Sequence, residues 1–332
     1  MSASIALSDE RVTVQSFLGP DDERSLADDV LDGLTRPLKE IPPKHFYDRA
    51  GSELFELICE LPEYYPSRTE RAILRESAAA IAETTQAAEL VELGSGSASK
   101  TRLLLSALTD VGTLERYVPI DVTDAAIRSV ATALVDEYPG LSVHGIVGDF
   151  ERHLACVPAA LGPRIVAFLG GTIGNFMPGS RRRFLRGIAA SLGADDHLLL
   201  GADLVKNPDV LEAAYDDRAG VTARFNRNVL HVINRELGAD FEPDRFEHVA
   251  FFDREHEWIE MRLRARQRMT VRIAALRLSV EFAPREELRT EISAKFTLSR
   301  LDADLAAAGL EPVELLTDEH ECFALSLARR RA

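Results

Sequence analysis

Cysteine is scarce in this sequence of 332 residues, which contains only Cys59, Cys156 and Cys322. The three lie far apart and form no CxxC pair, so the sequence predicts neither a disulfide framework nor a zinc site. We expect them to be free thiols. The eight histidines are also scattered singly, and no acidic cluster has the spacing of metal ligands, so no metal is predicted.

Basic residues are fewer than acidic ones, and long apolar runs are absent from the sequence. Lysine and arginine number 39 against 54 acidic residues, a formal net charge of -15. Such a chain repels a phosphate backbone, which argues against nucleic acid as a partner. No run approaches the roughly 20 apolar residues that span a bilayer, and residues 1–19 lack the basic segment and apolar core of a signal peptide. We therefore expect a cytoplasmic monomer that does not associate with membranes.

Two common enzyme signatures are missing. The sequence has no GxSxG elbow, which argues against a hydrolase of that type, and no GxxxxGK[ST] loop, which argues against a kinase.

The most informative segment that is present is LVELGSGSASKT at residues 90–101. An apolar run there ends in Gly94 and Gly96, which let the backbone turn and approach a ligand closely. Ser99 stands where a third glycine would complete the dinucleotide fingerprint, which argues against NAD or FAD.

The rest of the chain predicts an α/β fold. Strands are expected at residues 117–121, 141–147, 164–169 and 197–204, and helices at 123–138 and 180–192. The alternation then stops. The pattern next predicts helices at 209–215 and 221–237, antiparallel strands within 249–282, a helix at 293–309, and closing strands at 312–317 and 323–328, the last of them antiparallel.

Two closing strands after a final helix are typical of a methyltransferase sheet. We therefore predict a Rossmann-like class I methyltransferase domain formed by residues 76–205 and 287–332. A second α+β lobe that binds substrate would combine residues 1–75 with the insertion 206–286. Residues before Asp29 are not placed, although packing along the insertion is one option.

Polar residues at successive strand ends predict a nucleoside site. Asp121 follows the glycines by about 25 residues, where a carboxylate meets a ribose edge. Asp149 would accept from an adenine amino group, with Phe150 along the ring. Lys100 begins the helix after the glycine turn, where it can reach an anionic group. The alternatives are a turn or helix-cap role for each aspartate and a solvated lysine.

Two further segments are unusual in composition. Residues 46–55 and 61–70 contain three of the six tyrosines, which suits a small amphipathic ligand or a cation, or else a tyrosine-rich core. In residues 290–296, Glu291 and Ser293 alternate around Ile292 just before the expected helix. The alternative for this segment is a simple helix N-terminal cap.

Taken together, these segments resemble the S-adenosylmethionine-dependent L-histidine Nα-methyltransferases of ergothioneine biosynthesis. The resemblance runs from residue 42 to residue 327 and includes the blocks FYD, LPEYYP, ELGSG, GDF, TIGN, FNRNVL, IEM and TEIS. It departs from familiar members at Gly171 and Ala294, and at Leu315 and Leu316. By this resemblance the activity is the transfer of three methyl groups from S-adenosyl-L-methionine to the α-amino nitrogen of L-histidine, which gives hercynine.

The resemblance also implies roles for individual residues. The cofactor-binding set is Tyr47, Gly94, Lys100, Asp121, Asp149 and Phe150. The substrate-binding set is Phe55, Tyr64, Gly170, Asn175, Tyr215, Met261, Glu291 and Ser293. Within the second set, Tyr64 and Asn175 would orient the reacting amine, whereas Glu291 and Ser293 would hold the imidazole. Two rival interpretations remain open: a methyltransferase of the same fold for another amino acid or small amine, and a catalytically silent sensor of S-adenosylmethionine or histidine.

Overall fold

The computed structural model describes residues 4–6 and 10–331, and it divides the chain into two compact units. Unit 1 contains the described residues up to Leu18, the segment Pro66–Val205 and the residues from Phe296 onward. Unit 2 contains Gly19–Tyr65 and Lys206–Lys295. None of the described helices has the length and apolar character needed to cross a membrane.

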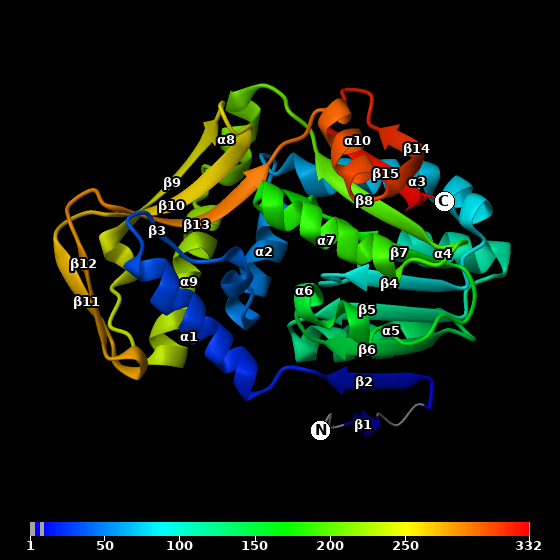
Figure 1. Cartoon of the computed structure of the whole chain (residues 1–332), viewed down its shortest axis with the longest axis horizontal. Helices are drawn as coiled ribbons and strands as arrows, with labels where there is room; N and C mark the ends of the chain where they lie inside the picture. The colour runs from blue at the N-terminus through cyan, green and yellow to red at the C-terminus, as the bar shows by residue number, and fades with distance from the viewer. Residues whose placement is uncertain (1–3, 7–9, 332) are drawn as a thin grey trace. The chain divides into compact units, whose positions relative to one another are not determined.

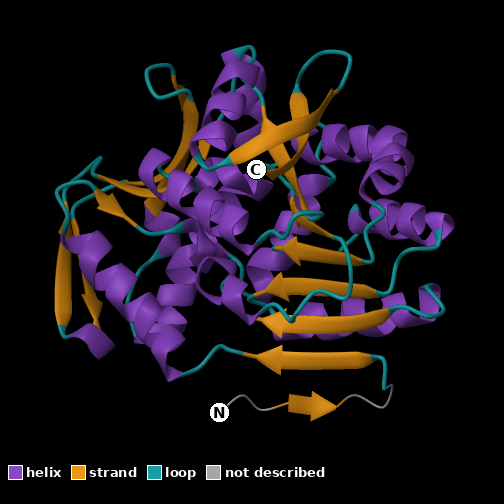
Figure 2. Cartoon of the chain, turned by 45° about the vertical axis from the view of Figure 1, so that its right-hand side comes forward, coloured by secondary structure: helices purple, strands orange, loops and turns teal. Residues whose placement is uncertain are grey.

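Unit 1 is built on a sheet of nine strands in the order β1-β2-β6-β5-β4-β7-β8-β15-β14 (Figures 1 and 2). The strands are β1 (Ser4–Ala6), β2 (Val12–Ser16), β4 (Glu89–Leu93), β5 (Arg116–Asp121), β6 (Ser142–Val147), β7 (Arg164–Phe168), β8 (His197–Asp203), β14 (Leu310–Thr317) and β15 (Phe323–Arg330). In this order, each strand from β2 through β6, β5, β4 and β7 to β8 is parallel to its neighbour. Strand β15 is antiparallel to both β8 and β14. The predicted antiparallel last strand is thereby confirmed.

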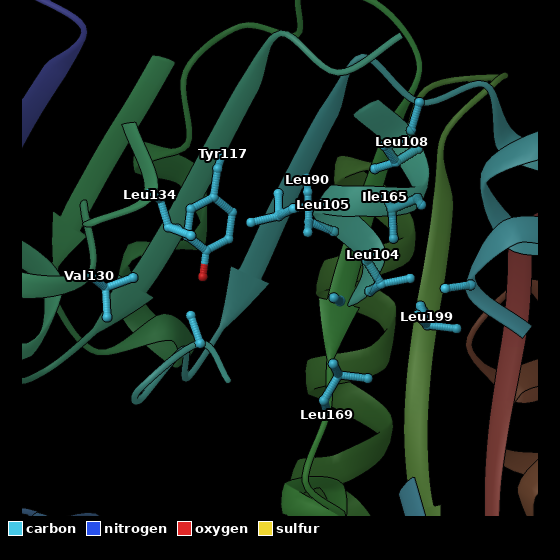
Figure 3. Packing of buried hydrophobic residues seen from close by; sticks show 14 of the residues in the cluster. Leu90, Leu104, Leu105, Leu108, Tyr117, Val130, Leu134, Ile165, Leu169 and Leu199 are labelled. Carbon is cyan, nitrogen blue, oxygen red and sulfur yellow. The ribbon is translucent and has the colours of Figure 1, made fainter. Parts of the chain in front are cut away.

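Helices flank this sheet. They are α3 (Tyr65–Thr85), α4 (Thr101–Val111), α5 (Asp124–Glu137), α6 (Phe150–His153), α7 (Pro178–Ser191) and α10 (Leu298–Ala307), with the short 3₁₀ helices η2 (Leu154–Cys156) and η3 (Thr172–Asn175). Along β7, Ile165 packs in a cluster with residues of α3, α4 and α5, whereas Phe168 contacts Phe184 of α7. Side chains alternate across a strand, so both faces of β7 are covered. Figure 3 shows Tyr117 of β5 beside Leu90 and Leu134 in this cluster.

Unit 2 combines a four-stranded sheet, a hairpin and helices. The four-stranded sheet has the order β3-β13-β10-β9, and β11 pairs with β12. Its elements are α1 (Pro20–Thr35), β3 (Lys39–Glu40), η1 (Pro43–Phe46), α2 (Arg49–Cys59), α8 (Pro208–Tyr215), α9 (Val221–Leu237), η4 (Pro243–Arg245), β9 (Phe246–Asp253), β10 (Trp258–Ala265), β11 (Met269–Ile273), η5 (Ala274–Leu276), β12 (Leu278–Phe282) and β13 (Glu287–Ala294). A second apolar cluster, which includes Phe225, Leu263 and Phe282, lies within this unit.

The observed division differs from the predicted boundaries in three places. Strand β2 pairs in parallel with β6 and so extends the sheet of unit 1, rather than joining the substrate lobe. The residues before Asp29 that follow Leu18 do belong with the insertion, in unit 2. The predicted boundary at residue 75 falls inside α3, which belongs to unit 1 from Pro66 onward. Strand β13 belongs to unit 2, because it pairs with β10 and β3. Residues 1–3, 7–9 and 332 of the predicted domains lie outside the described residues.

The predicted helix at 293–309 is wrong over its first five residues. Residues up to Ala294 continue strand β13, and the helix begins only at Leu298, where the Thr297 hydroxyl accepts a hydrogen bond from Arg300 N at 3.2 Å. The capping threonine therefore lies later in the chain than the sequence pattern indicated. Pairing between β13 and β10, which are distant in sequence, decided the conformation of residues 290–294.

Candidate active site

The glycine turn after β4 is held by a carboxylate from the next strand. Gly94 and Gly96 have φ angles of +75° and +49°, in the left-handed region that glycine tolerates. Gly96 N donates to Asp121 Oδ2 at 3.0 Å, and Thr123 N donates to Asp121 Oδ1 at 3.0 Å. A Cβ placed on Gly96 would meet no atom within 4 Å, so the turn is open on that side. The space and the carboxylate at the strand ends suit the ribose part of a nucleoside.

The GDF block lies beside the same turn. A Cβ on Gly94 would stand 3.6 Å from Cε1 of Phe150, so the ring is next to the glycine. The ring of Phe150 packs on Phe168, with centroids 5.3 Å apart. Asp149 Oδ1 accepts from Glu151 N at 2.9 Å and thus caps α6. The cap role considered for Asp149 is therefore present, and the residue also lies at a strand end beside an aromatic ring, as an adenine site requires.

Lys100 does not extend freely into solvent. It forms an ion pair with Glu70 of α3, a residue that is fully buried. The other oxygen of Glu70, Oε1, accepts from Gly170 N at 2.7 Å. Glu70 therefore ties the loop after β4 to the loop after β7. Asn175, on η3 in the second of these loops, is half-buried.

A second buried carboxylate supports the glycine turn from within the sheet. Glu92 of β4 accepts from the hydroxyl of Thr101 at 2.6 Å and from the hydroxyl of Tyr117 at 2.5 Å. Burial raises the pKa of Glu92 to about 7, even though these two hydrogen bonds lower it. Because Glu92 binds the hydroxyl of Thr101, the first residue of α4, it fixes the start of this helix and therefore the position of Lys100.

In unit 2, strand β13 places the TEIS block in a defined register. Glu291 lies opposite Met261 of β10, and Ser293 lies opposite Ile259. Residues two apart on a strand share a face, so Glu291 and Ser293 project from the same side of the sheet as Met261. The carboxylate, the hydroxyl and the thioether that were predicted to surround an imidazole are thus neighbours in the four-stranded sheet.

A buried lysine follows these two residues. Lys295 has no exposed surface, and its Nζ donates to Ser293 Oγ at 2.9 Å and to the Tyr215 hydroxyl at 3.0 Å. The Tyr215 hydroxyl in turn donates to Ser293 Oγ at 2.8 Å. The predicted substrate residues Tyr215 and Ser293 are therefore in direct contact, and Lys295 bridges them.

Glu291 on this face has a pKa that departs from its ordinary value. Burial raises its pKa to about 7, against the opposing effect of the nearby Lys295 charge. The side chain is half-buried and therefore accessible in part. A carboxyl group whose pKa lies near 7 can accept a hydrogen bond from a ring N–H. Its protonation can also respond to the charge of its ligand.

Aromatic side chains gather in the same unit. The rings of Tyr47, Phe55 and Phe225 contact one another, with centroids 5.5 to 5.9 Å apart. Tyr64 continues the group, with its ring centroid 6.1 Å from Phe55 and 6.3 Å from Tyr215. Burial, and then Tyr215, raises the pKa of Tyr64 well above its ordinary value. The Tyr64 hydroxyl therefore stays neutral near pH 7 and can orient a polar group, although it is a poor base.

Asp48 explains why the FYD and FNRNVL blocks occur together. Its Oδ1 caps α2 through Gly51 N at 2.8 Å and also accepts from Asn228 Nδ2 of α9 at 2.7 Å. Asn228 Nδ2 also reaches Phe46 O at 3.1 Å. A Cβ on Gly51 would lie 1.7 Å from Phe46 O, so only glycine fits. These contacts hold Tyr47 and the start of α2 against α9.

The predicted site residues therefore fall into two sets. Unit 1 holds Gly94, Lys100, Asp121, Asp149, Phe150, Gly170 and Asn175, whereas unit 2 holds Tyr47, Phe55, Tyr64, Tyr215, Met261, Glu291 and Ser293. Sequence reasoning assigned no role to Glu70, Phe225 or Lys295. The alternation of Glu291, Ser293 and Lys295 at every second residue was a strand signal that could have revealed the last of these. No group of three or more possible metal ligands occurs among residues 4–6 and 10–331.

The strand order, with an antiparallel last strand and a glycine turn after β4, defines a Rossmann-like class I methyltransferase fold. A family model described as histidine-specific methyltransferase, SAM-dependent, matches residues 26–330. The chain belongs to this family. Its residues fit the cofactor that the family uses, because the open glycine turn, the Asp121 carboxylate and the Phe150 ring adjoin one another.

Individual relatives agree with the family. The chain is 50% identical to the histidine N-alpha-methyltransferase of Mycobacterium tuberculosis over 96% of this chain and 100% of the relative. It is also 50% identical to the protein of the same name from Mycolicibacterium smegmatis, over 96% of this chain and 99% of the relative. Ergothioneine biosynthesis protein 1 of Schizosaccharomyces pombe is 31% identical over 70% of this chain and 31% of the relative.

Proposed function

We propose that this protein methylates the α-amino nitrogen of L-histidine three times with S-adenosyl-L-methionine and so forms hercynine for ergothioneine biosynthesis. The observation that carries the proposal is that Glu291 and Ser293 lie on one face of β13, with Glu291 opposite Met261, in a member of the histidine-specific family. A carboxylate and a hydroxyl together can satisfy both nitrogens of an imidazole. A site built in this way rejects a side chain that leaves its polar groups unpaired, by a factor of roughly 10⁴ or more.

We assign the cofactor to unit 1. Asp121 would accept from the ribose hydroxyls, Asp149 from the adenine amino group, and Phe150 would lie along the adenine ring. The turn at Gly94 leaves no side chain in the way, and Lys100 is fixed nearby by Glu70. Tyr47 is assigned to the methionine part of the cofactor. The cofactor supplies an electrophilic methyl group on a sulfonium centre.

The chain's own contribution to the reaction is placement. Histidine would be held by Glu291 and Ser293 at its ring, with Phe55 and Met261 along the imidazole, and Tyr215 is assigned to its backbone groups. Gly170 is assigned to substrate binding by the resemblance. Tyr64 and Asn175 would orient the α-amino nitrogen, so that its lone pair faces the methyl group. Orientation of two reactants can be worth roughly 7 to 11 kcal/mol.

The nitrogen must be neutral at each attack. One proton therefore leaves before the first transfer and one after each of the first two, while the third produces a quaternary ammonium that has no proton to lose. Because its pKa is raised by burial, the Tyr64 phenol remains protonated and acts by hydrogen bonding. An α-amino group with a pKa of about 8 reaches the neutral form at little cost. The faces of the Tyr47 and Tyr64 rings would stabilise the positive charge of the methylated α-ammonium group.

The test is to incubate the full chain with L-histidine and S-adenosylmethionine and to weigh the products by mass spectrometry. We expect histidine to gain one, two and finally three methyl groups. Methylation of a different amino acid in a panel, with histidine unchanged, would indicate a relative with another substrate. Binding of both ligands by calorimetry without any product would indicate a sensor. A cytoplasmic location and a monomeric state stay predictions from the sequence.

A further inference from the structure

Lys295 is a buried cation beside the proposed ring pocket. It follows β13 directly, it has no exposed surface, and its ammonium lies 4.6 Å from the centroid of the Tyr215 ring. A lysine ammonium carries only donors, so Tyr215 and Ser293 must both accept in their bonds with Lys295. Burying a lysine ammonium costs free energy, because the group loses its hydration, and hydrogen bonds inside the protein offset part of this cost.

These bonds determine where the proton of Ser293 can point. A hydroxyl has one proton and two lone pairs. The Ser293 oxygen accepts from Lys295 at 2.9 Å and from the Tyr215 hydroxyl at 2.8 Å, so both lone pairs are engaged. The Tyr215 proton is used in its bond to Ser293. None of these bonds uses the proton of Ser293 itself, so Ser293 is available to a ligand only as a donor.

We propose that Lys295 is a positioning residue that fixes Ser293 as a hydrogen-bond donor and so selects a substrate ring with an acceptor nitrogen. The inference rests on the proposed function, in which Ser293 faces the imidazole. Neutral imidazole has one N–H and one acceptor nitrogen, whereas imidazolium has two donors. Glu291 takes the N–H, Ser293 donates to the other nitrogen, and the pocket thereby prefers the neutral ring.

The same arrangement disfavours rings without a second nitrogen. An indole or pyrrole presents one N–H to Glu291 and a C–H to Ser293, which leaves the serine proton without an acceptor. An unpaired buried donor weakens binding by more than the loss of an average hydrogen bond. Lys295 also opposes protonation of Glu291, which helps to keep this carboxylate an acceptor.

A double-mutant cycle tests the proposal. The variants are Lys295→Met, Ser293→Ala and the two combined, with kcat and KM measured for histidine at saturating S-adenosylmethionine. Methionine keeps an unbranched chain but has no donors. We expect each single variant to raise KM about tenfold or more with a smaller change in kcat, and the double variant to resemble Ser293→Ala alone. Additive losses would show that Lys295 acts independently of Ser293 and would overturn the proposal.

Lys39→Met is the matched control. Lys39 is a lysine of the same unit that pairs with Glu286 and lies over the Phe282 ring, on strand β3 rather than beside Ser293. We expect its KM for histidine to match that of the unmodified protein. If Lys295→Met does not fold, Lys295→Gln probes the same network, because a neutral amide can accept from Ser293 as well as donate to it. A loss from Lys295→Gln that persists in full on the Ser293→Ala background would also overturn the proposal.

A ring analogue tests the donor assignment itself. In a pyrrolylalanine one ring nitrogen of histidine is replaced by C–H. We expect the unmodified protein to discriminate against the isomer that keeps the N–H for Glu291 at least tenfold in kcat/KM, and Lys295→Met to discriminate several-fold less. Equal discrimination in both proteins would refute the role of Lys295, whereas failure of the unmodified protein to methylate histidine at all would refute the proposed function instead.

Discussion

Glu291 offers a prediction in which stability and substrate binding move in opposite directions. Burial raises its pKa from 4.5 to about 7, so the folded protein holds a proton on this group between those two pH values while the unfolded chain has lost it. A folded-state pKa above the unfolded value lowers the free energy of unfolding as pH rises through this window. Each pKa unit corresponds to 1.36 kcal/mol, which gives a penalty of up to about 3 kcal/mol above pH 7.

The substitution Glu291→Gln keeps the shape of the side chain and removes the titration. We expect the variant to match the unmodified protein in stability near pH 4.5 and to exceed it by up to about 3 kcal/mol at pH 8. At that pH the carboxylate is the stronger acceptor for a ring N–H. A hydrogen bond to a charged group contributes about 1.5 to 3 kcal/mol, so the dissociation constant for histidine should rise roughly 10- to 150-fold in the variant.

Urea unfolding without ligands at several pH values, and calorimetric titration with histidine at pH 8, measure these two effects. Glu56→Gln is the control, because Glu56 is an exposed glutamate on α2 of the same unit. Glu92, whose pKa is also about 7, titrates equally in all three proteins and cancels. A stability difference that does not grow between pH 4.5 and 7, or unchanged histidine affinity, would refute the reasoning about Glu291.

Three further substitutions test the remaining assignments. Tyr64→Phe removes a neutral hydroxyl but keeps the ring, so we expect a changed ratio of mono-, di- and trimethylated histidine by mass spectrometry with little change in cofactor affinity; an unaltered distribution and rate would contradict the role of Tyr64. Asp121→Asn loses the charged acceptor that holds Gly96 N, and calorimetry should show about 10- to 100-fold weaker cofactor binding. Lys100→Met leaves the carboxylate of Glu70 buried without its cation and should lower the free energy of unfolding by about 3 kcal/mol, part of which Glu70→Gln restores in the double variant.

The sequence alone predicted most of unit 1. Strand and helix periodicity located β5, β6, β7 and β8 to within one residue at each end, because buried parallel strands are short apolar runs bounded by turn residues. The glycine turn and the aspartates at the strand ends were equally visible, since they depend on local backbone requirements. The family was also readable from separated sequence blocks, and the family model agrees with it.

Residues 290–295 show what a local pattern cannot decide. Thr290, Glu291 and Ser293 are residue types that favour a helix N-terminus, yet they lie in strand β13. β10 pairs with Glu291 and Ser293, and β3 pairs with the start of the same strand on its other side, at Leu288 and Arg289. Those partners lie about 30 and 250 residues earlier in the chain, so no local window contains them. β2 joined the sheet of unit 1 for the same reason, since β6 offered it a parallel edge.

The amino-acid sequence by itself determined the class of fold, the glycine turn and the family, because each depends on the order of neighbouring residues. Only the tertiary structure decided that Glu70 joins Lys100 to Gly170 and that Lys295 joins Ser293 to Tyr215. Buried charges need partners with the right donors and acceptors, and here those partners come from elements far apart in the chain. Their positions follow from strand pairing and packing, which act on the folded chain as a whole.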